Sequence, residues 1–156
     1  MALTGSSKSN ETERLYDLVR KRWIKKTPEE VVRQTLLQLM IKKLGFPLAL
    51  IAVEKELNQI PHLLRNRAAL PDRRVDIICF AKGIHPRFPL FPLLLVECKE
   101  DRITQAAIEQ VVGYNMFVEA PFIALADPTG AALLLPEGTL QKGLPSYEML
   151  LKAVQQ

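Results

Sequence analysis

The sequence predicts an α/β protein with three layers, α/β/α, around a central mixed sheet. The chain has 156 residues, 48% of them hydrophobic and 24% charged, which is a globular composition large enough for a substantial core. Segments with helical and strand patterns follow the order helix, three strands, helix, two strands, helix. Several of the strands are apolar without alternation, which indicates a sheet covered on both faces. We expect one domain over residues 15–156, preceded by a flexible tail at 1–14.

The N-terminal elements are predicted from charge and capping signals. Residues 11–26 are charged with scattered apolar positions, and we expect a short helix or an extended arm that docks through Tyr16, Val19 and Trp23. The next helix is predicted over residues 28–44, because Thr27 can cap it, Pro28 fits its first turn and Gly45 can end it. Glu30 completes a T-x-x-E capping box.

The remaining elements are predicted from apolar runs and helical periodicity. Strands are expected at residues 48–57, 74–81, 90–99, 121–126 and 131–135, and further helices at 103–118 and from Ser146 onward. A long basic connection, residues 58–73, and a proline-containing loop, 82–89, join the first three strands.

Several classes of protein are excluded or disfavoured by composition. No apolar run is long enough for a membrane span, and the first residues lack the apolar stretch of a secretory signal. Cys79 and Cys98 lie in apolar strand-like segments, so we expect buried free thiols and a cytoplasmic location. A net charge of +4 permits an anionic partner without specifying one.

Three ionisable residues interrupt the apolar strands at positions that suggest chemistry. Glu97 and Lys99 share one face of their strand, because side chains alternate along a strand. If the preceding strand pairs with it as an antiparallel hairpin, Asp76 can point to the same side and nearly meet Glu97. Two carboxylates that close repel each other unless a cation lies between them, and Mg²⁺ prefers such oxygen ligands. The pattern therefore suggests a site for phosphodiester hydrolysis, with Lys99 available to hold a water or to stabilise charge on phosphorus.

An ordinary explanation of the same pattern remains open. Asp76 could pair with Arg73 or Arg74, and Glu97 with Lys99, as salt bridges at the ends of strands. The spacing alone does not decide between the two interpretations, because a D…ExK pattern often occurs by chance.

Three further polar residues are candidates for the same site. Gln110 and Tyr114 are four residues apart, so they lie on one face of the predicted helix and can point back toward the end of the preceding strand. Glu30 lies on the apolar stripe of its own helix. Its ordinary role is the capping box, and a second role as an inward-facing carboxylate is compatible with it.

The motifs together resemble a known family. TPEEVVRQTLLQLMIKKLGFPLALIAVEKEL, RRVDIICF and FPLLLVECKEDRITQAAIEQVVGYN resemble the N-terminal domain of type I restriction enzyme R subunits, over roughly residues 15–127. That domain belongs to the PD-(D/E)XK nuclease superfamily, so the resemblance implies a restriction-endonuclease-like fold and a metal-dependent DNA nuclease core. By motif it makes Asp76 and Glu97 metal ligands and Lys99 the catalytic lysine. It adds Glu30 to the metal site and places Gln110 and Tyr114 beside it.

The sequence also departs from that family. It has no GxxxxGK[ST] phosphate-binding loop, so we expect that it cannot translocate DNA by itself. The partners that we expect besides DNA are either separate motor or specificity subunits or a second copy in a homodimer. Relatives often carry an Asn-Gly turn after the strand beyond QxxxY, where this sequence has Asp-Pro-Thr-Gly at 127–130.

Basic residues gather around the predicted site and are candidates for contacts with DNA phosphates. They are Arg65, Arg67, Arg73, Arg74 and Arg102. Ordinary solvated loop charge is the alternative for each of them.

The first hypothesis is an endonuclease that hydrolyses DNA with Mg²⁺, for which Mn²⁺ can substitute. The second is a non-catalytic module that binds nucleic acid or a partner on the same fold. A third is a nuclease with another target, such as branched DNA or RNA. The acids favour the first over the second, because carboxylates that face phosphate repel it when no cation is present.

Overall fold

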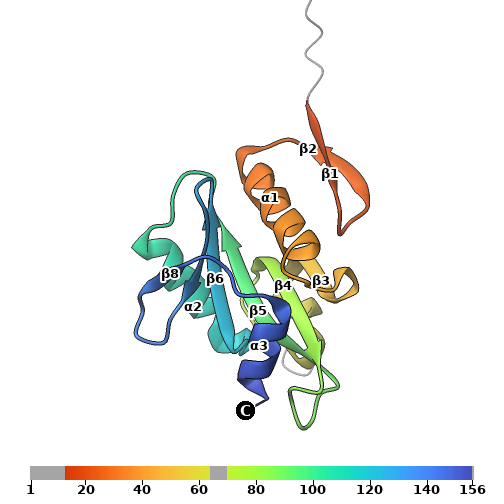
Figure 1. Ribbon diagram of the computed structural model, residues 1–156, viewed down its shortest axis with the longest axis vertical. Helices are drawn as coiled ribbons and strands as arrows, with labels where there is room; N and C mark the ends of the chain where they lie inside the picture. Colours follow the sequence, from red (N-terminus) through yellow and green to blue (C-terminus); the bar gives the residue numbers. More distant parts are fainter. Residues whose placement is uncertain (1–12, 64–69, 156) are drawn as a thin grey trace, which may run out of the picture.

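The computed structural model describes residues 13–63 and 70–155, and its centre is a six-stranded sheet in the order β3-β4-β5-β6-β7-β8 (Figure 1). The strands are β3 (Ile51–Glu56), β4 (Arg74–Lys82), β5 (Leu90–Cys98), β6 (Phe122–Asp127), β7 (Gly130–Leu134) and β8 (Leu140–Lys142). Neighbouring strands are antiparallel except β5 and β6, which are parallel and are connected through a helix. The sheet is therefore mixed, as predicted.

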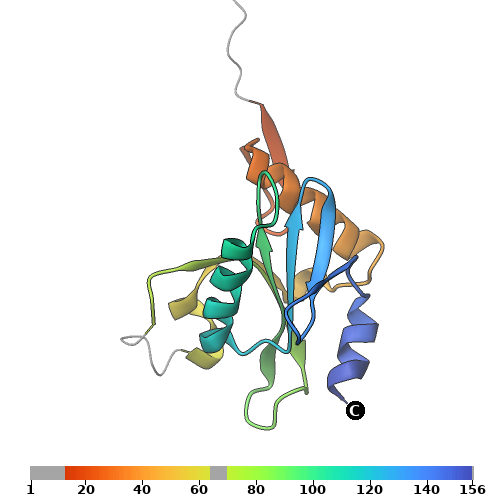
Figure 2. The same cartoon turned by 90° about the vertical axis from the view of Figure 1, so that its left-hand side faces the viewer.

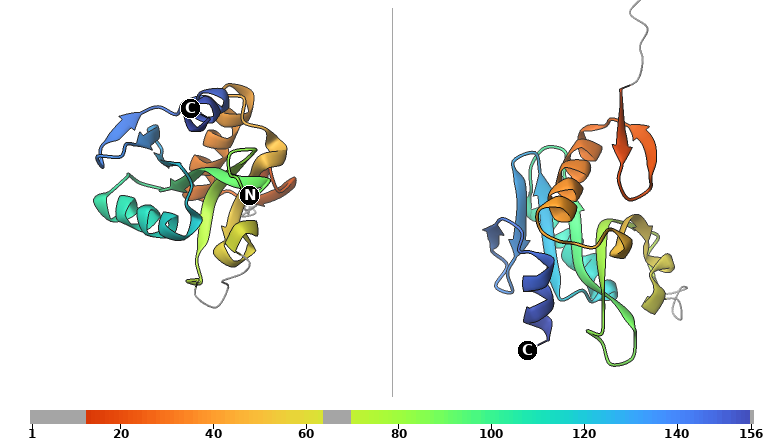
Figure 3. Two further views of the ribbon diagram at one scale, coloured as in Figure 1. Left: turned by 90° about the horizontal axis from the view of Figure 1, so that it is seen from below. Right: turned by 45° about the vertical axis from the view of Figure 1, so that its right-hand side comes forward.

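Helices cover both faces of the sheet (Figures 2 and 3). They are α1 (Pro28–Lys42), α2 (Gln105–Val118) and α3 (Tyr147–Val154). Leu37 of α1 and Leu150 of α3 belong to one apolar cluster with one face of the sheet, whereas Val111 of α2 belongs to a second cluster with the other face. The predicted three-layer α/β/α architecture is confirmed.

Local signals in the sequence set the ends of the helices. The Thr27 hydroxyl accepts a hydrogen bond from the Glu30 backbone N–H at 3.2 Å, and Gly45, at φ +72°, follows the end of α1. Thr104 caps α2 and Ser146 caps α3 in the same way as Thr27 caps α1. α2 therefore begins two residues after the predicted start.

The β4–β5 hairpin forms the middle of the sheet and carries the predicted acids. Its register shifts between Cys79 and Phe80, where Phe80 pairs with Pro92. Because proline cannot donate a hydrogen bond to the ladder, the irregularity explains how a proline is accommodated in a central strand. Cys79 and Cys98 are both buried free thiols, as expected.

The segment before α1 differs from the prediction. It forms a two-stranded hairpin, β1 (Arg14–Asp17) and β2 (Arg22–Lys25), that lies beside α1 and outside the main sheet (Figure 1). Of the two alternatives predicted, the extended arm agrees with these strands and the helix is wrong. The expected docking of Tyr16 and Trp23 is also wrong, because both side chains are exposed. Val19 does pack against the α1 side of the core. Arg14 belongs to β1, and residues 1–12 of the predicted tail lie outside the described residues.

Smaller differences concern short elements. Residues 48–50, predicted as strand, form a 3₁₀ turn before β3, and a second such turn (Leu57–Gln59) follows β3. Sequence patterns missed β8, whose three residues are all exposed. Part of the basic connection, residues 64–69, lies outside the described residues. Among the helices that the structure describes, none combines the length and the apolar character that crossing a membrane requires.

Candidate active site at the ends of the central strands

Acidic side chains from three adjacent strands lie at one level of the sheet. The register of β4 with β5 places Asp76 opposite Glu97, and the ladder pairs on either side place Glu54 of β3 at the level of Asp76. Glu54 has a left-handed backbone, φ +49°, which is unusual for a residue other than glycine. The sheet therefore brings the two predicted acids together and adds a third.

Arg33 of α1 neutralises much of this acidic row. Its side chain is 1% exposed, and its Nη2 donates to Glu29 at 2.9 Å, to Glu54 at 3.1 Å and to Asp76 at 3.1 Å. Its Nη1 donates to Glu30. Burial alone would lower the pKa of Arg33, but the surrounding carboxylates raise it, so the guanidinium stays charged.

Asp76 is held on both oxygens. Oδ1 accepts from Arg33, and Oδ2 accepts from the backbone N–H of Cys98 at 2.7 Å. The second bond crosses from β4 to β5 and fixes the carboxylate against the end of the neighbouring strand. Asp76 therefore pairs with Arg33, and not with Arg73 or Arg74 as in the ordinary explanation of the sequence pattern.

The carboxylate of Glu97 is buried, but it has fewer favourable contacts than that of Asp76. Its one ion pair within the described chain is with Lys99, whose Nζ lies 3.4 Å from Oε1. Burial and the negative charge of Asp76 raise the pKa of Glu97 to about 8, against the opposing effect of Lys99. This carboxylate would be stabilised by an additional cation.

Lys99, Gln110 and Tyr114 form a connected chain. Lys99 Nζ donates to Gln110 Oε1 at 3.2 Å, and Gln110 Nε2 donates to the Tyr114 hydroxyl. The structure thus places the predicted glutamine where it orients the lysine, with the tyrosine behind it on the same face of α2.

A cavity of about 410 Å³ opens beside these residues. Glu29, Lys99, Arg102 and Gln110 are among the side chains that line it. Burial and the charge of Asp76 raise the pKa of Glu29, so this glutamate shares the electrostatic field of the strand acids. Glu30, the predicted third acid, instead binds Arg20 at 2.9 Å and Arg33.

The residues present fit a divalent cation in part. Asp76 and Glu97 supply hard oxygen donors on facing strands, and the pKa of Glu97 is raised because burial and Asp76 together outweigh its pairing with Lys99. Within residues 13–63 and 70–155, however, no group of three or more His, Cys, Asp or Glu side chains is already arranged around one cation position. A cation at the two facing acids would need water or phosphate for its remaining ligands, as is usual for Mg²⁺.

The basic candidates are distributed unevenly around the site. Arg102 lines the cavity, whereas Arg73 and Arg74 are exposed at the start of β4, and Arg74 pairs with Glu56 at 3.3 Å. Arg65 and Arg67 lie outside the described residues.

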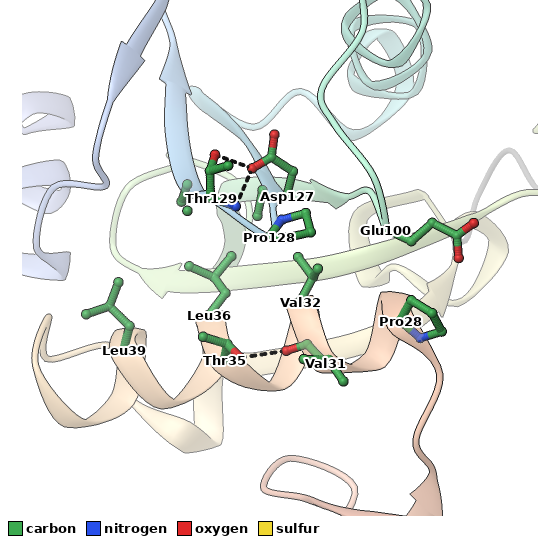
Figure 4. Close-up of a pocket in the computed structure, with 13 residues that line it drawn as sticks. Pro28, Val31, Val32, Thr35, Leu36, Leu39, Glu100, Asp127, Pro128 and Thr129 are labelled. Carbon is green, nitrogen blue, oxygen red and sulfur yellow. Dashed lines mark hydrogen bonds between the residues drawn. The ribbon is translucent and has the colours of Figure 1, made fainter.

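A larger cavity, of about 530 Å³, lies elsewhere on α1 (Figure 4). Val32 and Leu36 of α1 face the β6–β7 turn, where the Asp127 carboxylate accepts hydrogen bonds from the Thr129 backbone N–H and hydroxyl. Its lining is mostly apolar and contains none of the predicted site residues. Its size therefore does not make it the candidate active site.

Sequence reasoning missed Glu29, Arg33 and Glu54. Arg33 was detectable, because it stands three residues after Glu30 and four before Leu37, on the helical stripe that turns inward. A cation on an apolar stripe predicts buried carboxylate partners. Glu54 gave no such signal, since its place depends on the register of β3 and on its left-handed backbone.

This combination defines an α/β domain with an acid–lysine site at the end of its central strands. The family model for the type I restriction enzyme R protein N terminus (HSDR_N) matches residues 28–135, and the chain belongs to that family. The domain is thus a module of the restriction-system class. Neither a curated protein nor a solved structure matches the chain.

Proposed function

We propose that this domain is a Mg²⁺-dependent endonuclease that hydrolyses DNA phosphodiester bonds. The observation that carries the proposal is the position of Asp76 opposite Glu97, one step beyond the Ile77–Val96 pair of β4 and β5, with Lys99 3.4 Å from Glu97. The family supports a role in restriction, in which such a domain would act on DNA together with separate motor or specificity subunits, or as a homodimer. The superfamily assignment, PD-(D/E)XK, remains part of the proposal.

The roles of the residues follow from their contacts. Asp76 and Glu97 would hold the cation, and the Glu29 carboxylate lines the cavity and interacts with Asp76. When bound, the cation would supply Lewis-acid polarisation of the phosphate and of the attacking water. Lys99, oriented by Gln110, would stabilise the negative charge that develops on the phosphate oxygens. Arg102, on the cavity wall, would position the DNA backbone.

Glu30 takes a different place in this proposal from the one that the sequence predicted. Its carboxylate binds Arg20 and Arg33, so it would act on the cation site by holding Arg33. Mn²⁺ would support the same reaction in place of Mg²⁺, because both ions prefer carboxylate and water ligands.

The test is plasmid cleavage with Mg²⁺ or Mn²⁺ by wild type, Asp76→Ala and Lys99→Ala. Asp72→Asn is the matched control, because it removes an exposed acid four residues before Asp76. We expect cleavage by wild type and the control, and a loss of about 100-fold or more in the two site variants. Equal cleavage by all four proteins would show that the nicking came from a contaminant and would contradict the proposal.

One observation favours a second candidate, a non-catalytic module that binds nucleic acid or a partner. The Arg33 guanidinium pairs with Asp76, so the acidic row has a structural counter-charge within the protein. DNA binding by wild type without cleavage in either metal would favour this candidate.

A further inference from the structure

One face of the β1–β2 hairpin combines aromatic and basic side chains. The strands pair Arg14 with Lys25 and Tyr16 with Trp23. Because side chains alternate along a strand, these two cross-strand pairs lie on the same face. All four residues are exposed, and we call this surface the aromatic–basic face.

The aromatic pair on this face is open to solvent. Trp23 is 65% exposed and Tyr16 is 44% exposed. Their rings meet edge to face, with centroids 5.4 Å apart and planes at 69°. The opposite face of the hairpin already supplies its packing, because Leu15 and Ile24 are half-buried there. The exposed rings are therefore not needed to hold the hairpin against the domain.

The hairpin also carries the positive charge of the protein. Residues 13–26 contain six of the 21 basic residues and only two of the 17 acidic ones. The net charge of this segment is therefore +4, equal to that of the entire chain. Asp17 is buried and its charge is neutralised by Arg20. Four cations of the hairpin form no ion pair with any acid in the part of the chain that the structure describes. They are Arg14, Lys21, Arg22 and Lys25.

The hairpin is joined to the candidate active site by ion pairs. Arg20 contacts Glu30 at 2.9 Å and Glu54 at 3.7 Å. Arg33, which binds Asp76, also binds both of these glutamates. One carboxylate and one guanidinium therefore link Arg20, in the turn of the hairpin, to Asp76 of the candidate site.

We propose that the aromatic–basic face binds a single-stranded segment of nucleic acid next to the cleavage site. Cations at the edge of the face hold phosphates, and Trp23, with Tyr16 beside it, stacks on an unpaired base. A duplex offers phosphates but no free base faces, so the aromatic pair favours a single strand. The inference rests on the proposed function for DNA as the polymer, but the hairpin lies outside the family match at residues 28–135.

The test measures binding by the full chain in EDTA, so that cleavage cannot occur. Fluorescence anisotropy gives the Kd for a mixed-sequence single-stranded oligonucleotide and for its blunt duplex, over a series of salt concentrations. The variants are Trp23→Ala and the double change Arg14→Ala and Lys25→Ala, which removes the two cations of the face. Met149→Ala and Lys142→Ala are matched controls, because they remove an exposed apolar side chain and an exposed cation far from the hairpin.

We expect Trp23→Ala to weaken binding of the single strand about tenfold, and to change the Kd for the duplex less than about twofold. The double variant should lower the slope of log Kd against log salt for the single strand by about 1.4, because each of the two phosphate contacts contributes roughly 0.7. The two controls should bind as wild type does. Circular dichroism of each variant checks that the fold is retained.

Unchanged binding by both hairpin variants would overturn the proposal, as would an equal loss on single strand and duplex. Binding of anionic lipid vesicles that depends on Trp23, without binding of either oligonucleotide, would assign the face to a membrane and overturn it too. Failure of the proposed function is separate, because it would appear as absent cleavage in Mg²⁺ while the effects on binding in EDTA persist.

Discussion

Two buried carboxylates, one in the hairpin and one in the sheet, differ in how their charge is compensated. Asp17 accepts hydrogen bonds from the backbone N–H groups of Val19 at 2.8 Å and Arg20 at 2.9 Å, and pairs with the Arg20 side chain. Burial alone would raise its pKa, but these bonds lower it. Glu97 is also buried, yet its pKa is raised to about 8 by burial and by Asp76.

The difference separates a structural acid from one that is available to a ligand. Asp17 closes the turn between β1 and β2, and its negative charge is compensated by hydrogen bonds within the hairpin. Glu97 carries an unfavourable interaction with Asp76 that folding does not relieve. Such uncompensated charge is characteristic of functional sites.

The largest expected effect comes from removing the cation that compensates the other acids. Arg33→Met leaves Asp76, Glu54 and Glu30 without their shared partner, so we expect the free energy of unfolding to fall by about 3–5 kcal/mol. Urea denaturation measures this change. Arg74→Met, which removes a guanidinium that is 63% exposed, should cost less than about 1 kcal/mol. A similar small cost for Arg33→Met would show that the buried network does not hold the acids.

The next effect concerns activity, and it distinguishes the two carboxylates directly. Glu97→Gln should reduce cleavage by about 100-fold or more, because it removes a cation ligand. The same change should leave the free energy of unfolding unchanged or higher, because burial and Asp76 already disfavour the charged form of this carboxyl group. Cleavage kinetics and urea denaturation of one preparation measure both. A destabilisation of about 2 kcal/mol would contradict the comparison, since Glu97 would then be a structural acid.

Asp17→Asn should give the opposite result. We expect a loss of about 2 kcal/mol in the free energy of unfolding, because the amide cannot pair with Arg20 although it can still accept the backbone hydrogen bonds. Cleavage by the folded variant should stay within a few-fold of wild type. Glu13→Gln is the control, because its exposed pair with Lys26 contributes little.

The comparison also shows which features the sequence could predict. Helix α1 follows from Thr27, Pro28 and Gly45, which act within a few residues of the helix ends. The facing of Asp76 and Glu97 follows from an antiparallel hairpin with alternating side chains. Both inferences need only local geometry.

The features that were missed depend on tertiary contacts or on unusual turns. The β1–β2 turn has no glycine. It is closed instead by the Asp17 carboxylate, with Lys21 in the left-handed region at φ +54°. The charge pattern of residues 11–26 alone therefore could not distinguish a helix from a hairpin. Glu29 and Glu30 are adjacent and both bind Arg33, but Glu30 also binds Arg20 of the hairpin whereas Glu29 lines the cavity, and this division depends on tertiary contacts.

The smallest expected effect is the pH dependence of the hairpin acid. The pKa of Asp17 in the folded protein lies below its ordinary value of 3.8, so the stability that it contributes is complete above that value and is lost as the pH falls through the folded pKa. The difference in unfolding free energy between wild type and Asp17→Asn should therefore be constant from about pH 7 to 5 and should narrow below about pH 4. Urea denaturation of both proteins at each pH measures it. A difference that widened on acidification would mean that the pKa of Asp17 is raised, as it is for Glu97, and the distinction between the two acids would fail.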